Sequence, residues 1–303
     1  VQTQDRPMMQ ARRSRGEGKK AAWRFNPRDS VRRFSNKIAK LMCNKKIAEF
    51  LQRLAKAMPL YTLFLDCDDT LYSNDWRTAN GITELIESYC VSTLGLAPGR
   101  AYDLYKAHGT CLAGLLAESI PVDVEAFLAA VHPSRAVLAE TIRADPALRS
   151  MLERIDRTKV DVYVFTASSS QHCANCLSLL AIDDVLLIDA DHAIIDCRAV
   201  ATYGASGDSN DVVFRTKHDP EAFATAQRLA KQPDPSRCYL VDDSWSNMRA
   251  AAAAGWHPVL VGSTARDGRS AAELPEKELV IDVIAQLESA LPQLFIGGVS
   301  RAT

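Results

Sequence analysis

The sequence predicts an α/β protein: a doubly wound parallel sheet with an inserted all-helical cap and a basic N-terminal extension. After Leu60, short apolar runs alternate with helix-patterned stretches, and this order gives parallel strands with helices on both faces. The stretch between the first and second runs contains no convincing strand. We expect the extension at residues 1–59, the core at 60–77 and 158–303, and the cap at 78–157.

The net charge of −1 conceals two oppositely charged segments. Residues 1–59 hold 16 basic and 4 acidic side chains, a net charge of +12, whereas the rest of the chain holds 20 basic and 33 acidic side chains, a net charge of −13. With 303 residues, 47% of them hydrophobic, the chain can bury a sizeable core. No stretch approaches about 18 consecutive apolar residues, so we expect no membrane-spanning helix.

The basic extension contains one helical pattern. From Ile47 to Met58 apolar residues recur every three or four positions with basic residues between them, and Pro59 ends the pattern. The first 35 or so residues have few aliphatic side chains and are predicted to be disordered. Three interpretations stay open for this extension: a targeting sequence, a contact with a surface or nucleic acid, and a helix that docks on the following domain.

The eight cysteines are scattered without the spacing of a disulfide scaffold, which favours a reducing compartment. We therefore expect a cytoplasmic location, or an organelle if residues 1–59 are a targeting sequence. His172, Cys173 and Cys176 are close in sequence, but a structural zinc site needs four ligands and no second motif completes one. We interpret these two cysteines as buried thiols on a helix.

Five apolar runs have the length and composition of strands, and helix-patterned stretches separate them. The predicted strands are 61–65, 160–165, 185–188, 238–241 and 258–261, and the predicted helices of the core include 171–182, 219–231 and 246–254. The insertion at 78–157 is predicted to form several helices, broken at Pro98-Gly99, Pro121 and Pro133.

Acidic residues follow two of the predicted strands directly. Asp66, Asp68 and Asp69 come after the strand at 61–65, and Asp242 and Asp243 come at the end of the strand at 238–241. The carboxyl ends of parallel strands are where open sheets bind their ligands. Five carboxylates at one edge would repel one another unless a cation lay among them, and oxygen ligands suit Mg²⁺. We therefore predict a Mg²⁺ site at this edge.

A hydroxyl-rich turn follows the strand at 160–165. It begins at Thr166-Ala167 and leads into a helix, and hydroxyls with free N–H groups at the start of a helix bind anions. Lys217 precedes another predicted helix and supplies a positive charge. Asn247, five residues after Asp242, is expected to support the Asp242 loop.

In this order the residues resemble a known family. Asp66-x-Asp68-x-Thr70, then Thr166, Lys217 and Asp242-Asp243 match the four motifs of the haloacid dehalogenase-like superfamily of Mg²⁺-dependent phosphohydrolases. The resemblance covers about residues 60–295 and implies a Rossmann-like core with a helical cap between the first two motifs.

The resemblance also implies roles for these residues. Asp66 would attack phosphorus and form an aspartyl-phosphate. Asp68 would protonate the leaving alcohol and then activate water. Asp66, the backbone carbonyl of Asp68, and Asp242 would hold Mg²⁺, while Asp243 would orient a metal-bound water or Lys217. The phosphoryl oxygens would be bound by Thr166, the N–H of Ala167, and Lys217, and Thr70 would shape the turn after the nucleophile.

Three shorter segments, 63–72, 105–115 and 290–294, resemble the plant and fungal pyrimidine 5′-nucleotidase-like branch of that superfamily. This implies a nucleoside 5′-monophosphatase whose partner is a small phosphorylated metabolite, with no nucleic acid bound by the core and no oligomeric state predicted. The side chains that are candidates for contacting the substrate are Trp76, Tyr105, Lys106 and His108.

Other functions stay open at this point. Asp68 supplies the acid that an alkoxide leaving group needs and a carbon–halogen bond does not, so it favours phosphohydrolysis over dehalogenation. A phosphatase of another small phosphoester, such as a sugar phosphate, and a sugar phosphomutase would use the same motifs. A phospho-ligand binding protein without catalysis would be expected to lack at least one motif residue.

Overall fold

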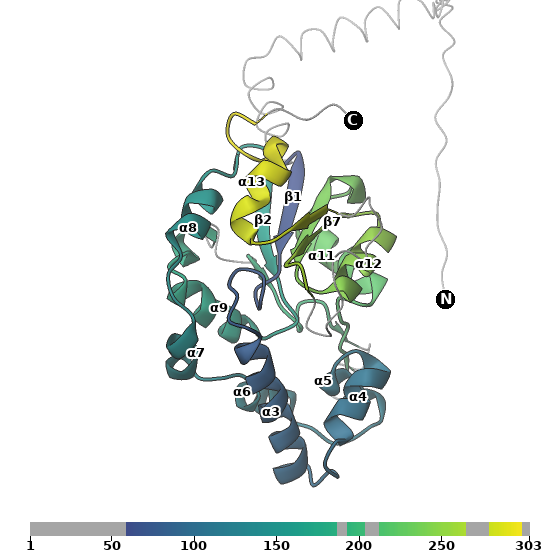
Figure 1. The fold of residues 1–303 in the computed structure, drawn as a ribbon. Coiled ribbons are helices and arrows are strands. Elements are labelled where there is room, and N and C mark those ends of the chain that lie inside the picture. Colours follow the sequence, from purple (N-terminus) through teal and green to yellow (C-terminus); the bar gives the residue numbers. More distant parts are fainter. Residues whose placement is uncertain (1–58, 187–192, 204–211, 265–278, 299–303) are drawn as a thin grey trace, which may run out of the picture. The chain divides into compact units, whose positions relative to one another are not determined.

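The chain folds around a six-stranded parallel sheet with the strand order β3-β2-β1-β6-β7-β8 (Figure 1). This computed structural model describes residues 59–186, 193–203, 212–264 and 279–298. The predicted disordered segment and the predicted helix of the extension lie outside these residues. Within them, the predicted doubly wound α/β fold is confirmed.

Four of the five predicted strands form. The sheet consists of β1 Tyr61–Leu65, β2 Val160–Phe165, β3 Ile194–Ile195, β6 Cys238–Asp242, β7 His257–Val261 and β8 Leu279–Ile281. A separate antiparallel pair is made by β4 Thr202–Tyr203 and β5 Val212–Val213. The strands β3 and β8, and this pair, are additions to the predicted set.

The strand predicted at 185–188 is wrong in the part that the structure describes, because Asp183–Leu186 forms the short helix α10. Two aspartates in its first turn favour a helix through their interaction with the helix dipole. The strand that pairs with β2 on the side away from β1 is β3, a few residues further along, where Ile194 lies opposite Val164.

Helices cover the sheet and form the insertion. In chain order they are α3 Arg77–Ser92, α4 Arg100–His108, α5 Cys111–Ala117, α6 Val124–Ala130, α7 Arg135–Thr141, α8 Pro146–Glu153, α9 Ser170–Leu179, α11 Pro220–Leu229, α12 Trp245–Ala253 and α13 Leu287–Ala290. None of the described helices has the length and apolar character required to cross a bilayer.

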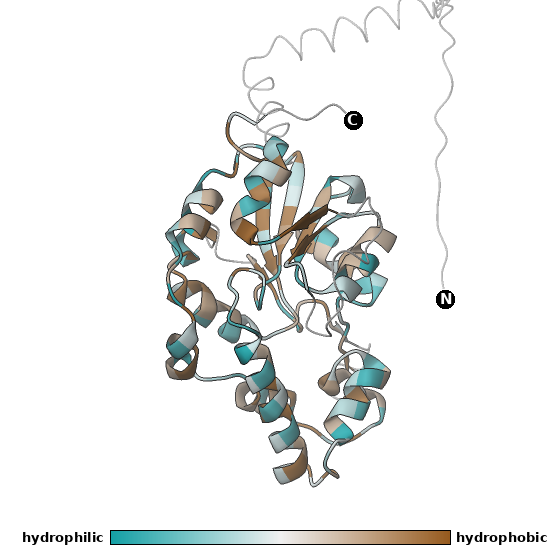
Figure 2. Cartoon of the chain, viewed as in Figure 1, coloured by the Kyte–Doolittle hydropathy of each residue, from teal (hydrophilic) through white to brown (hydrophobic). Residues whose placement is uncertain are grey.

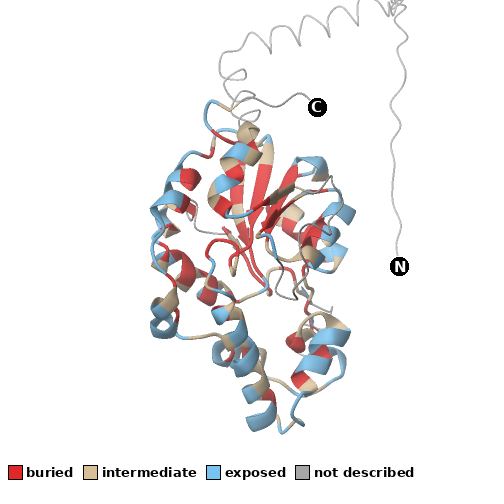
Figure 3. Cartoon of the chain, in the orientation of Figure 1, coloured by how far each residue is buried: buried red, intermediate tan, exposed pale blue. Residues whose placement is uncertain are grey.

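Each central strand is apolar on both sides, because alternate residues of a strand point to opposite faces. In β1, Leu63 and Leu65 join a cluster that includes residues of α8, α9 and α13, whereas Phe64 joins a cluster with residues of α11 and α12. Phe64 stacks on Trp256 with ring centroids 4.3 Å apart. Figures 2 and 3 show the result: brown, buried strands between helices whose outer faces are hydrophilic and exposed.

The helices α3 to α6 share a core of their own. It contains Cys90, Leu104, Leu115 and Phe127, and Phe214 after β5 also joins it. The helices α7 and α8 instead pack their apolar residues into the sheet's core. Within the predicted cap at 78–157, buried residues up to Val131 therefore belong to the separate core, and those from Leu138 onward belong to the core of the sheet. We propose that the part of the cap with an independent core ends near Val131.

The predicted breaks between these helices are confirmed. Gly99 adopts a left-handed conformation (φ 85°) immediately before α4, while Pro121 and Pro133 lie in the turns that follow α5 and α6. Side chains accept hydrogen bonds from the first backbone N–H groups of α5, α6, α7 and α8. Such N-caps satisfy donors that a short helix otherwise leaves free.

Two glycines in these helices allow the packing to be tested. A Cβ at Gly114 in α5 would lie 2.7 Å from Leu104 Cβ, whereas a Cβ at Gly81 in α3 would meet nothing within 4 Å. We expect Gly114→Ala to lower the free energy of unfolding by about 1–3 kcal/mol through overpacking. Gly81→Ala should leave it unchanged or raise it by up to about 1 kcal/mol, because alanine favours a helix. Urea unfolding of both variants checks this; similar values for the two would contradict the close α4–α5 packing.

Candidate active site

Three neighbouring strands bring the predicted site residues to one edge of the sheet. Asp66 directly follows β1, Thr166 directly follows β2 and Asp242 ends β6, and β1 lies between the other two strands. The backbone N–H of Asp66 donates to the carbonyl of Val241 at 2.9 Å, which extends the β1–β6 pairing to the site. The prediction that strand ends gather these residues agrees with this arrangement.

Lys217 lies among the carboxylates as a buried cation. Its Nζ is 2.6 Å from Asp66 Oδ1 and 2.7 Å from Asp242 Oδ2, and it donates to the carbonyl of Phe165 at 3.0 Å. Only 4% of its surface is exposed. Burial acts to lower the pKa of Lys217, but the two aspartates outweigh it and raise that pKa, so the ammonium form is retained.

Asp242 is fixed by further donors. Asn247 Nδ2, in α12, lies 2.9 Å from Oδ1 and 3.1 Å from Oδ2, and the backbone N–H of Ser244 donates to Oδ1 at 2.8 Å. Ser244 is also the N-cap of α12, so the turn that carries Asp242 and the helix that carries Asn247 begin together. Asn247 therefore contacts Asp242 directly, and its supporting role stays a prediction.

Carboxylate oxygens of Asp66, Asp242 and Asp243 all lie within 4.8 Å of one another. Burial, followed by the charges of Asp242 and Asp243, raises the pKa of Asp66 well above its usual range even though Lys217 opposes the shift. Burial and the charges of Asp242 and Asp69 raise the pKa of Asp243 to about 7. A hard divalent cation would relieve this crowding of oxygen donors, so the residues fit Mg²⁺.

This grouping differs in detail from the expected ligand set. Asp243 was expected to act behind the ligands, yet its carboxylate lies with those of Asp66 and Asp242. The side chain of Asp68 turns to other partners, and a metal contact through its backbone carbonyl stays a prediction. We propose Asp66, Asp242 and Asp243 as the carboxylates nearest to a bound Mg²⁺.

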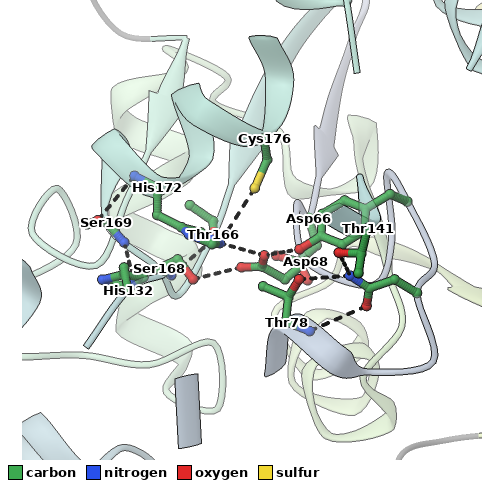
Figure 4. A network of polar contacts seen from close by, with 12 residues as sticks. Asp66, Asp68, Thr78, His132, Thr141, Thr166, Ser168, Ser169, His172 and Cys176 are labelled. Atoms are coloured by element: carbon green, nitrogen blue, oxygen red, sulfur yellow. Dashed lines mark hydrogen bonds and ion pairs between the residues drawn. The ribbon is translucent and has the colours of Figure 1, made fainter. Parts of the chain in front are cut away.

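The carboxylate of Asp68 is enclosed by three polar side chains (Figure 4). Tyr72 Oη donates to Oδ1 at 2.6 Å, Ser168 Oγ donates to Oδ2 at 2.7 Å, and His172 Nε2 lies 2.8 Å from Oδ1. Burial acts to raise the pKa of Asp68, but His172, Tyr72 and Ser168 together hold it well below its usual range. Burial acts to lower the pKa of His172, but the Asp68 carboxylate outweighs it and raises that pKa to about 10.

Sequence reasoning missed Tyr72 and His172 as site residues. His172 was interpreted only together with Cys173 and Cys176, and both cysteines are buried thiols on α9. The only signal for His172 was its place in the first turn of the helix that follows the hydroxyl-rich turn. Nothing in the spacing linked it to Asp68, which lies 104 positions earlier.

The side of the site predicted to bind phosphate is formed by the turn after β2. Thr166 is buried, and its Oγ1 accepts a hydrogen bond from the N–H of Ser168 at 3.0 Å, with Ala167 between them. Thr70 is also buried, in the turn where the N–H of Leu71 donates to the carbonyl of Cys67. Phosphate binding by Thr166, Ala167 and Lys217 stays a proposal.

The four candidates for substrate contact lie in the loop after Asp66 and in the cap. Trp76 is half-buried at the start of α3 in a left-handed conformation (φ 55°). Tyr105 and Lys106 are exposed on α4 and both contact Tyr102. His108 Nε2 lies 3.4 Å from a Glu118 oxygen. Their role in substrate binding stays a prediction.

A different part of the cap does approach the site. A Cβ at Gly109, which has a φ of +84° in the α4–α5 turn, would lie 3.1 Å from Thr216 Oγ1 and 3.5 Å from His218 Nδ1. These two residues flank Lys217, so the α4–α5 turn lies against the segment that carries the buried lysine.

The sequence of this chain is similar to those of known proteins. Residues 61–255 match the haloacid dehalogenase-like hydrolases, and the chain belongs to that family. Phosphate metabolism protein 8 of Saccharomyces cerevisiae is 24% identical over 205 residues, which cover 65% of this chain and 60% of the yeast protein. The chain thus spans less than two thirds of the length of this relative.

Two solved structures are similar to this chain at low identity. CbbY from Rhodobacter sphaeroides in complex with phosphate is 18% identical, with 75% of this chain and 96% of CbbY covered and a TM-score of 0.47. The 2-haloacid dehalogenase from Pseudomonas syringae pv. Tomato DC3000 is 19% identical, with 77% and 99% covered and a TM-score of 0.43.

We expect Mg²⁺ affinity to depend on pH because of Asp243. Its pKa of about 7 means that the folded protein without metal binds a proton there at lower pH, and Mg²⁺ must displace that proton. The proton of Asp243 should lower the affinity by up to about tenfold per pH unit below this pKa. Calorimetric titration with Mg²⁺ at several pH values measures this. Asp243→Asn should weaken binding and flatten the dependence; an unchanged dependence in that variant would contradict the assignment.

Proposed function

We propose that the protein is a Mg²⁺-dependent phosphomonoester hydrolase that acts through an aspartyl-phosphate. The observation that carries the proposal is the position of Asp66: its carboxylate lies at the end of β1, 2.6 Å from the buried Lys217 ammonium and grouped with the carboxylates of Asp242 and Asp243. A nucleophile, a cation and oxygen ligands for a metal therefore meet at one point, as phosphoryl transfer requires.

In the first step an oxygen of Asp66 attacks phosphorus, and the bond from phosphorus to the ester oxygen breaks. Because the Asp68 carboxyl is ionised in the free protein, it first takes up a proton from the phosphomonoester or from water, and then gives this proton to the ester oxygen, which leaves as an alcohol. In the second step water attacks the aspartyl-phosphate, Asp68 takes a proton from this water, and the bond to Asp66 breaks to release phosphate. Bound Mg²⁺ would supply positive charge that offsets the repulsion between Asp66 and the phosphate.

The chain's own residues would hold the phosphoryl group during both steps. Lys217 places its ammonium beside Asp66, and Thr166 lies at the end of the adjacent strand β2. With the N–H of Ala167 they would bind the oxygens on which negative charge develops. Asn247 and the N–H of Ser244 fix Asp242 in one orientation, which keeps the oxygen ligands in place.

For the substrate we propose a nucleoside 5′-monophosphate, with pyrimidine nucleotides favoured by the resemblance of segments 63–72, 105–115 and 290–294. The core residues contact only the phosphate, so the cap and the loop after Asp66 would select the rest of the molecule. A sugar phosphate is the second candidate. A phosphomutase would use the same four motifs, and a non-catalytic phospho-ligand binding protein would show binding without turnover.

We propose a cytoplasmic location for the protein, with an organelle as the alternative if the basic residues 1–59 act as a targeting sequence. Imaging of the tagged full chain beside a chain that lacks residues 1–45 distinguishes these two locations.

Asp66→Asn should abolish turnover, because an amide cannot form the aspartyl-phosphate. We expect hydrolysis of p-nitrophenyl phosphate with Mg²⁺ to fall by at least about 10³-fold, as for the loss of other nucleophiles. Asp103→Asn, which removes one charge from the exposed face of α4, is the matched control and should keep full activity. Retention of more than about a few per cent of activity by Asp66→Asn would show that the nucleophile is wrongly assigned.

A substrate panel tests the specificity. UMP, CMP, AMP, NMN and several sugar phosphates are compared at equal Mg²⁺, and removal of the metal by EDTA should stop every reaction reversibly. We expect the highest kcat/KM for UMP or CMP. A preference for sugar phosphates would favour the second candidate, and binding of these compounds without turnover of any, by a folded protein with Mg²⁺, would contradict the enzymatic function.

A further inference from the structure

The two oxygens of the Asp68 carboxylate have different surroundings (Figure 4). Oδ1 has two partners, the hydroxyl of Tyr72 at 2.6 Å and Nε2 of His172 at 2.8 Å, whereas Oδ2 accepts one hydrogen bond from Ser168 at 2.7 Å. The side chain of Asp68 is 18% exposed while that of His172 is fully buried. Oδ1 is thus the anchored oxygen, and Oδ2 retains capacity for another partner.

The imidazole of His172 has few polar partners other than Asp68. It is 1% exposed in α9, and its Nδ1 has no hydrogen-bond partner among the described residues. The remaining polar neighbour is Cys176, whose Sγ lies 3.6 Å from Nε2. Burying an imidazole costs free energy that hydrogen bonds must offset. The hydrogen bond to Asp68 is therefore the contact that an apolar side chain here could not replace.

A second histidine restrains the ring of His172. His132, which follows α6, packs against it with ring centroids 4.9 Å apart. Nδ1 of His132 donates to the carbonyl of Leu128 at 2.7 Å, and its Nε2 accepts from the N–H of Ser169 at 3.4 Å. Because both ring nitrogens of His132 form hydrogen bonds, its ring is held in one orientation against the ring of His172.

We propose that His172 is a positioning residue for proton transfer by Asp68. Together with Tyr72 it anchors Oδ1, so that Oδ2 is the oxygen that gives the proton to the leaving alcohol and later takes one from water. His172 itself touches neither the substrate nor the attacking water. This role rests on the proposed function, since it presupposes hydrolysis through Asp66 and Asp68.

The test uses leaving groups that differ in their need for an acid. An alkoxide must be protonated as it leaves, whereas p-nitrophenolate leaves without a proton. The alkyl phosphate is glycerol phosphate or the best nucleotide of the panel. In the full chain with Mg²⁺, His172→Leu should lower kcat/KM for this substrate by about 10–100-fold. For p-nitrophenyl phosphate kcat/KM should change by less than about threefold, because misplacing the acid does not affect that leaving group.

The second half of the reaction gives an independent readout. Activation of water by Asp68 should also slow in His172→Leu, whereas formation of the aspartyl-phosphate from p-nitrophenyl phosphate should not. We therefore expect a burst of about one p-nitrophenolate per chain in rapid mixing, followed by slow turnover.

Three further variants separate positioning from packing. His172→Gln can still donate to Oδ1 and should recover most of the kcat/KM for the alkyl phosphate that His172→Leu loses. Cys173→Ala perturbs the next buried residue of α9 without touching Asp68 and should behave like the wild type. Tyr72→Phe removes only the hydroxyl that shares Oδ1, so it should show the same leaving-group-dependent loss; it also provides the test if His172→Leu fails to fold.

Equal losses on both substrates, or no loss on the alkyl phosphate, in His172→Leu or Tyr72→Phe would overturn the positioning role while leaving the proposed function intact. Absence of phosphomonoester hydrolysis by the wild-type protein would instead overturn the proposed function, and the positioning role with it.

Discussion

The ammonium group of Lys217 is the contact on which the arrangement of the site depends. It contacts the carboxylates of Asp66 and Asp242, at the ends of β1 and β6, and the carbonyl of Phe165, the last residue of β2. It therefore links the carboxyl ends of three neighbouring strands. Removing one member of a buried ion pair leaves a desolvated charge without a partner, which is more costly than losing an exposed pair. The position of Asp66, the proposed nucleophile, and the stability of this edge of the sheet are therefore linked through one side chain.

One ammonium does not balance the charge gathered around it. The carboxylates of Asp66, Asp242 and Asp243 lie close together, and the pKa values of Asp66 and Asp243 are raised, chiefly by burial and then by neighbouring carboxylates. The site thus holds three carboxyl groups beside the one ammonium group of Lys217. This imbalance makes the geometry suitable for a hard divalent cation.

The sequence predicted the parts of the site that depend on strand ends, because a buried strand followed by an acidic residue is a local pattern and parallel strands end at a common edge. Asp66 and Asp242 could be found in this way, whereas Lys217 was identified by its place before a predicted helix and by the order of the motifs. The pairing of His172 with Asp68 could not be found from the sequence, since it depends on how α9 packs in the hydrophobic cluster that also contains residues of β1, and no local pattern indicates it. The strand expected at 185–188 failed for a related reason: an apolar run of four residues fits a buried strand or a short helix, and Asp183 and Asp184 favour the helix.

The hydrophobic residues of α3 to α6 form a cluster apart from the two clusters that flank the sheet. Free-energy effects of substitutions in separate clusters are nearly additive, since the altered side chains share no partners. New side chains can therefore accumulate in these helices while the strands that carry Asp66 and Asp242 keep their stability. Substitutions in the helices proposed to select the substrate can therefore arise during evolution without changing the residues proposed to carry out the reaction.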